Sequence, residues 1–213
     1  MKNLITLLIV LFSLNGFTQK IDYTNFDNDL ATKALAEAFL NFRDTIDCFG
    51  GGKKWNVTDP VVDSFPEMNK PRWSDWVYEN ISLPNCVEMS NNAKNVLYHV
   101  DRTDWYRGNE QLVRDVYYEG VPNVPQVRVD HARLRYSENI FMYTGEKETY
   151  QELATHMIVL WENSTHHRNA QRGLLYDTFS YKEYGLKIQD LFACCVIYNP
   201  YTKTTRSSMN FIK

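Results

Sequence analysis

Two short stretches of the sequence combine side chains that can bind a metal or hydrogen-bond a ligand. The first runs from His131 to Glu138, and the second, Trp161–Asn169, contains the adjacent histidines His166 and His167. Two imidazoles and one carboxylate are a workable ligand set for zinc, with a fourth position left for water. The same groups could instead form a hydrogen-bonded network in which Glu138 orients one imidazole and no metal is bound.

The spacing of these residues disfavours hydrolysis by a serine nucleophile. Ser164, His167 and Glu138 supply the residue types of a nucleophile, a base and an orienting carboxylate. However, Ser164 lies three residues before His167, and no Gly-x-Ser-x-Gly turn surrounds it. The helical His-Glu-x-x-His motif of zinc proteases does not occur either. We therefore expect a binding site, with a metal-dependent hydrolase as the alternative.

The two stretches resemble the CAP superfamily (cysteine-rich secretory proteins, antigen 5 and pathogenesis-related proteins, also called SCP-like domains) in its bacterial form. Members carry a histidine, then Glu-Asn-Ile, then Trp-x-Asn-Ser-x-x-His-Arg-x-Asn. This chain has the first two in that order, and its Trp161–Asn169 stretch matches the third as far as Arg168, with an asparagine directly after the arginine. The resemblance extends over Leu30–Tyr198. It implies an α+β fold built as a three-layer α/β/α sandwich around a mostly antiparallel sheet, with His131, Glu138 and His167 on the floor of a central cleft.

The resemblance also implies roles for single residues at this cleft. Some members bind a divalent metal there, which makes His131, Glu138 and His167 candidate ligands of Zn²⁺ or a similar ion. The family pattern places a histidine before Arg168, and this selects His167 over His166. Ser164 stands where eukaryotic members carry a second glutamate, so a four-group site loses one member here.

The expected product is an exported, non-catalytic CAP-domain binding module with a cleft for a small lipid, a peptide, a glycan or a divalent metal; a protein partner is a further alternative. Ser164 and Arg168 are candidate ligand-binding residues at the rim. Arg168 could equally form a surface ion pair with Glu162 or Asp177. His131 has an alternative interpretation as a surface histidine on a basic strand, next to Arg133.

Other residues of the two stretches are expected to be structural. Asn139 is expected to fix a turn through side-chain to backbone hydrogen bonds. Trp161 is expected in the core, because large aromatic side chains dominate burial. His99 and His156 have no chemical partners nearby in the sequence and are interpreted as structural.

The N-terminus has the features of a secretory signal. Lys2 precedes an apolar run of 11 residues, Leu4–Leu14, which is too short for a membrane span. We expect residues 1–19 to be a signal peptide and 20–213 to form one secreted or periplasmic domain without a transmembrane segment; an uncleaved anchor is the alternative. With 23 Lys and Arg against 26 Asp and Glu, the chain lacks the basic excess of a nucleic-acid-binding protein.

Export would permit disulfides among the four cysteines. Cys48 and Cys86 flank the loop between two expected helices, and a bridge between them is the preferred pairing. Cys194 and Cys195 are neighbours in an apolar run. They are expected to be buried thiols on opposite faces of a strand, since adjacent strand residues point in opposite directions.

Apolar spacings of three and four predict helices over residues 29–47, 83–99 and 149–162. Two strands joined by a short turn are expected over residues 184–188 and 191–198. Residues 50–82 and 101–130 contain interrupting prolines or glycines and are expected to be loop insertions that determine specificity.

Overall fold

The computed structural model describes residues 19–45, 71–92, 97–99, 108–126, 129, 134, 136–172 and 189–212. Nearly all of the expected signal peptide, residues 1–18, lies outside these ranges, as do Cys48, His131 and the strand expected over residues 184–188. No helix within the described ranges is long and apolar enough to cross a membrane.

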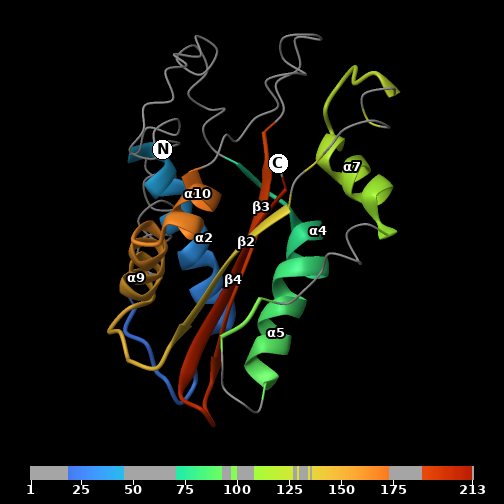
Figure 1. Cartoon of the computed structure of the whole chain (residues 1–213). Coiled ribbons are helices and arrows are strands. Elements are labelled where there is room, and N and C mark those ends of the chain that lie inside the picture. The colour runs from blue at the N-terminus through green and yellow to red at the C-terminus, as the bar shows by residue number, and fades with distance from the viewer. Residues whose placement is uncertain are drawn as a thin grey trace, which may run out of the picture.

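The described elements run in the order α2 (Asn28–Thr45), β1 (Arg72–Trp73), α4 (Asp75–Val77), the π-helical turn η2 (Tyr78–Ser82), α5 (Leu83–Asn91), α7 (Glu110–Tyr118), β2 (Tyr136–Tyr143), α9 (Tyr150–Glu162), α10 (Thr165–Arg172), β3 (Leu191–Asn199) and β4 (Thr204–Ile212) (Figure 1).

The strands form one mixed sheet in the order β1-β3-β4-β2. Strands β2, β4 and β3 are antiparallel neighbours, while the two-residue β1 runs parallel to β3. Helices together with a mixed sheet confirm the α+β class. Strand β3 confirms the strand expected over residues 191–198; within the described part of the chain its partners are β4 and β1.

Helices cover both faces of the sheet (Figure 1). Helices α2, α9 and α10 lie on one face, and the run of α4, η2 and α5 lies on the other. The predicted helix over residues 29–47 is confirmed by α2, whose apolar stripe is buried against the sheet. The ring of Phe39 on this helix lies 5.2 Å from that of Phe192 and 5.5 Å from that of Phe211, centre to centre.

Helix α9 confirms the helix expected over residues 149–162. It begins with a capping box: the Thr149 hydroxyl accepts from the Glu152 amide, and the Glu152 carboxylate accepts from the Thr149 amide. Trp161 near its end is fully buried and donates from Nε1 to the Ile140 carbonyl at 2.8 Å. This confirms Trp161 as a core residue and shows that it attaches α9 to β2.

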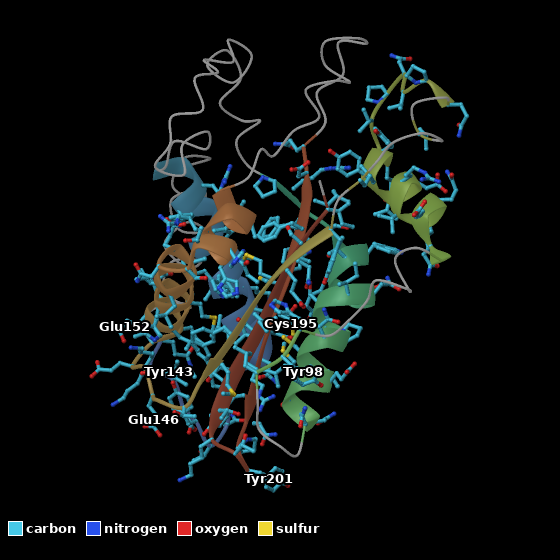
Figure 2. The ribbon with its side chains drawn as sticks, viewed as in Figure 1. Tyr98, Tyr143, Glu146, Glu152, Cys195 and Tyr201 are labelled. Carbon is cyan, nitrogen blue, oxygen red and sulfur yellow. The ribbon has the colours of Figure 1, made fainter. Side chains whose placement is uncertain are left out.

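The cysteines of β3 alternate between the two faces of the sheet. Cys194 belongs to the core under α2 and α9, whereas Cys195 packs with Cys86 of α5 on the other face (Figure 2). All three are buried free thiols, which confirms the expectation for Cys194 and Cys195. The expected bridge from Cys48 to Cys86 involves a residue outside the described ranges; among the described contacts, the Cys86 thiol donates to the Cys195 carbonyl at 3.0 Å.

Several expectations for the connecting segments are corrected. Residues 101–130, expected to be irregular, contain helix α7, and residues 50–82 contain β1, α4 and η2. The helix expected over residues 83–99 ends at Asn91. Strands β2 and β4 are not among the predicted elements. Most side chains of β4 are polar even though the whole strand is buried, so no alternation of apolar residues marks it.

Candidate functional site

Strand β2 places Glu138 at the edge of the sheet, opposite Asn210 of β4. Its side chain is on the same face as Ile140, two residues further along, which packs with Cys86 of α5. The Glu138 side chain is only 5% exposed. A carboxylate at this depth is costly unless its oxygens are hydrogen-bonded.

One oxygen of Glu138 is surrounded by uncharged donors. Oε1 accepts from Asn85 Nδ2 at 2.7 Å, from Ser208 Oγ at 2.8 Å and from Asn210 Nδ2 at 3.3 Å. All three donor residues are fully buried. The carboxylate is therefore held in one orientation by α5 and β4.

These donors are themselves hydrogen-bonded. Asn210 Nδ2 also donates to the Tyr136 hydroxyl at 2.6 Å, and Asn210 Oδ1 accepts from Ser82 Oγ at 2.7 Å. A connected polar network of this kind fixes side chains more firmly than isolated pairs do. It also explains why two polar side chains of β4, Ser208 and Asn210, can be buried.

The other oxygen of Glu138 pairs with His99, a histidine interpreted from the sequence as structural. His99 Nδ1 lies 2.8 Å from Glu138 Oε2, and the imidazole side chain is 57% exposed. His99 has no chemical partner near it in the sequence, but the fold makes it the exposed half of a carboxylate–imidazole pair with Glu138. Since Nδ1 faces the carboxylate, a ligand would meet Nε2.

His167 of α10 lies beside this pair. Its ring centre is 6.5 Å from that of His99. Asn139 of β2 donates from Nδ2 to the His167 carbonyl at 3.0 Å and so joins α10 to β2. Asn139 is structural, as expected, although it acts from within a strand and not at a turn. Burial, with smaller contributions from His99 and His166, lowers the pKa of the His167 imidazole.

The remaining candidates are in less informative positions. His131 lies outside the described residues. Ser164 accepts from the Arg168 amide at 2.8 Å at the start of α10, and Arg168 Nη2 is 3.5 Å from the Thr165 hydroxyl. Among the described contacts, neither Ser164 nor Arg168 reaches Glu138 or His99. Asp177, the alternative partner of Arg168, is outside the described ranges.

The described residues contain no group of three or more His, Cys, Asp or Glu side chains that could hold a metal ion. Glu138 Oε1 already accepts three hydrogen bonds, which leaves little capacity for a cation. The imidazoles of His99 and His167 are the groups that could still provide ligand nitrogens. Glu138 would then orient His99 from behind.

Short sequence motifs identify Glu138 and His167 as candidate site residues, but no motif identifies His99. His99 lies 39 residues before Glu138, and no motif links the two. His156 of α9, the other histidine interpreted as structural, packs its ring 4.8 Å from that of Tyr143. No family model, curated protein or solved structure was found to match this chain.

Proposed function

We propose that this protein is an exported, non-catalytic binding module of the CAP type, whose ligand binds at His99, Glu138 and His167. The Glu-Asn-Ile and Trp-to-Asn motifs support the family assignment. Helices on both faces of a mixed sheet are compatible with a three-layer α/β/α sandwich. The apolar run at the N-terminus supports export.

One observation carries the proposal: a buried, fully hydrogen-bonded carboxylate orients an exposed imidazole. The Glu138 oxygens are occupied by Asn85, Ser208 and Asn210 on one side and by His99 on the other. A general base needs a free lone pair within reach of the substrate proton. Glu138 is only 5% exposed, and its Oε2 faces His99, so a positioning role suits it better than the role of base in a hydrolase.

The exposed ring of His99 provides the contact with the ligand. Its Nε2 can donate to or accept from a polar group of a lipid headgroup, a peptide or a glycan, or can bind a divalent metal together with His167. A bound metal would supply Lewis-acid chemistry, and metal-dependent hydrolysis is therefore the competing function.

The test is native mass spectrometry of the mature protein purified from an oxidising compartment, before and after denaturation. We expect an adduct that disappears on denaturation and is lost in His99→Ala and in His167→Ala. His156→Ala, which changes a histidine of α9 that packs on Tyr143, is the matched control and should keep the adduct.

The same variants separate binding from catalysis. Zn²⁺ is added to each protein, and hydrolysis of peptide and ester substrates is measured. Zinc-dependent turnover that is lost in His99→Ala and His167→Ala would establish the hydrolase instead. An adduct that survives in both variants would show that the ligand binds elsewhere and would overturn the proposal.

A further inference from the structure

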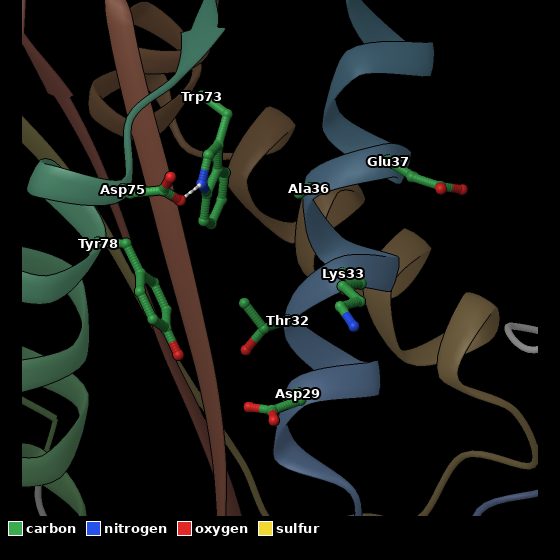
Figure 3. A pocket seen from close by; sticks show the side chains of 8 residues that line it. All are labelled: Asp29, Thr32, Lys33, Ala36, Glu37, Trp73, Asp75 and Tyr78. Carbon is green, nitrogen blue, oxygen red and sulfur yellow. Dashed lines mark hydrogen bonds between the residues drawn. The ribbon is translucent and has the colours of Figure 1, made fainter.

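A groove of about 440 Å³ lies at the β1 edge of the sheet, the edge opposite β2 and Glu138. Figure 3 shows Trp73, Asp75 and Tyr78 on one wall and α2 on the other. The residues that line it are Asp29, Thr32, Lys33, Ala36, Glu37, Trp73, Asp75 and Tyr78.

Helix α2 contributes to the groove through a face distinct from its core stripe. Its lining residues are at positions 29, 32, 33, 36 and 37, and these spacings of three and four define one side of a helix. The core stripe is offset by about two positions and includes Ala34, Leu35 and Phe39. The helix therefore presents a second face to the groove.

The opposite wall is a supported aromatic surface. The Trp73 ring packs edge-on against Phe192 at 5.6 Å and tilted against Tyr78 at 5.6 Å. Trp73 Nε1 donates to Asp75 Oδ1 at 2.8 Å, which fixes the rotation of the indole. Trp73 nevertheless remains 37% exposed. An indole held on several sides and open on another is suited to contact a ligand with its ring.

The charged lining is predominantly acidic. Asp29, Glu37 and Asp75 face one cation, Lys33, for a formal balance of three negative charges against one positive charge. In Figure 3 the Glu37 side chain points away from Trp73, so Asp29 and Asp75 are the carboxylates nearest the rings. Burial raises the pKa of Tyr78 to about 12, further above physiological pH than the ordinary value, so its hydroxyl adds no negative charge to the groove.

We propose that this groove binds a small organic ammonium ion, held over the faces of Trp73 and Tyr78 with Asp29 and Asp75 as counter-charges. Aromatic rings attract cations through the negative potential of their faces, and Trp is the strongest of them. Carboxylates beside the rings add to that attraction. A purely apolar ligand would gain nothing from the charges, and an anion would be repelled by them.

The experiment is a calorimetric titration of the purified protein with choline at low salt. Millimolar affinity is expected, and it should weaken as sodium chloride is added. The matched control ligand is the neutral analogue of choline in which carbon replaces nitrogen, because it has the same shape without the charge. It is expected to bind at least about fivefold more weakly.

Variants locate the site. Trp73→Leu should weaken choline binding by about tenfold, and Asp29→Asn by about threefold. Lys33→Glu should strengthen it by about threefold through the added negative charge. Asp115→Asn removes one negative charge, as Asp29→Asn does, but on an exposed side of α7, and it should have no effect. The two α2 variants keep the test decisive if Trp73→Leu does not fold.

Four results would overturn the proposal. Equal affinity for choline and its neutral analogue would show that the groove recognises shape and not charge. Tighter binding of a neutral disaccharide than of choline would identify a glycan site. Absence of choline binding at low salt, or unchanged binding in both Asp29→Asn and Lys33→Glu, would show that this groove does not bind ammonium ions.

Discussion

Glu138 illustrates at the residue scale how uncharged donors and an imidazole can hold a buried carboxylate. Its described partners are three uncharged donors and one imidazole. Hydrogen bonds to a charged acceptor are stronger than those between neutral groups, so together they offset the cost of removing the carboxylate from water. The stability of the site is therefore coupled to the identity of residue 138.

Glu138→Ala should lower the free energy of unfolding by about 2–4 kcal/mol, because buried donors of Asn85, Ser208 and Asn210 would lose their acceptor. Glu138→Gln keeps one acceptor oxygen and should cost about half as much. Urea denaturation measures both. Glu146→Ala, on the loop after β2, is the control and should be neutral within about 0.5 kcal/mol. Equal stability of Glu138→Ala and the wild type would contradict the hydrogen-bond network.

The buried thiols give a second prediction at this scale. Burial raises the pKa of the Cys86 and Cys194 thiols well above the ordinary value and keeps them protonated. Thiols in that state are poor nucleophiles. Under native conditions, a thiol reagent such as DTNB should leave Cys86, Cys194 and Cys195 unmodified. After denaturation in guanidinium all three should react, as peptide mass mapping would show. Rapid labelling of any of them in the native protein would argue against this packing.

At the scale of elements, the site depends on how β2 is attached to its neighbours. Asn139 links β2 to α10, Trp161 links it to α9, and β4 pairs along its whole length. Glu138 and Asn139 are consecutive residues of this strand, so Glu138 points toward α5 and Asn139 points toward α10 on the opposite face. Because β2 is an edge strand, groups from both faces can meet at its border, where His99 and His167 lie 6.5 Å apart.

Trp161→Phe tests this attachment. The substitution preserves an apolar ring but removes the Nε1 hydrogen bond and leaves the Ile140 carbonyl without that donor. A loss of about 1–3 kcal/mol is expected. Leu160→Ala on the same helix changes a side chain that is 42% exposed, so it should cost clearly less. Thermal unfolding of the two variants makes the comparison, and a larger loss in Leu160→Ala would refute the anchoring role of Trp161.

At the scale of the whole molecule, two histidines make stability depend on pH. Burial lowers the pKa of His156, with a further contribution from Lys147, and burial followed by the charges of His99 and His166 lowers that of His167. The unfolded chain therefore takes up protons more readily than the folded protein. Stability from this source is complete above the ordinary histidine pKa of 6.5 and declines as the pH falls below it.

The free energy of unfolding should accordingly be lower at about pH 5.5 than at about pH 7.5. The variant His156→Gln/His167→Gln should show a smaller difference between the two values, because neither glutamine titrates. Urea denaturation at both pH values provides the four measurements. A pH dependence as steep in the double variant as in the wild type would mean that other groups cause it.

The sequence by itself determined the elements whose burial follows a simple period. The apolar stripes of α2 and α9, the apolar run of β3 and the core position of Trp161 are all visible in residue order. Each of these residues is buried because its own side chain is hydrophobic, and this is a local property of the sequence. Glu138 and His167 could also be identified, since short motifs mark their positions.

The tertiary structure alone decided the rest. Strand β4 is polar in sequence, and its Ser208 and Asn210 can be buried because Ser82, Tyr136 and Glu138 complete their hydrogen bonds. His99 becomes a candidate ligand-binding residue only when the chain between it and Glu138 brings the two side chains within 2.8 Å. The spacing of apolar residues predicts which side chains are buried. Which polar groups distant in sequence pair with one another depends instead on the fold of the whole chain.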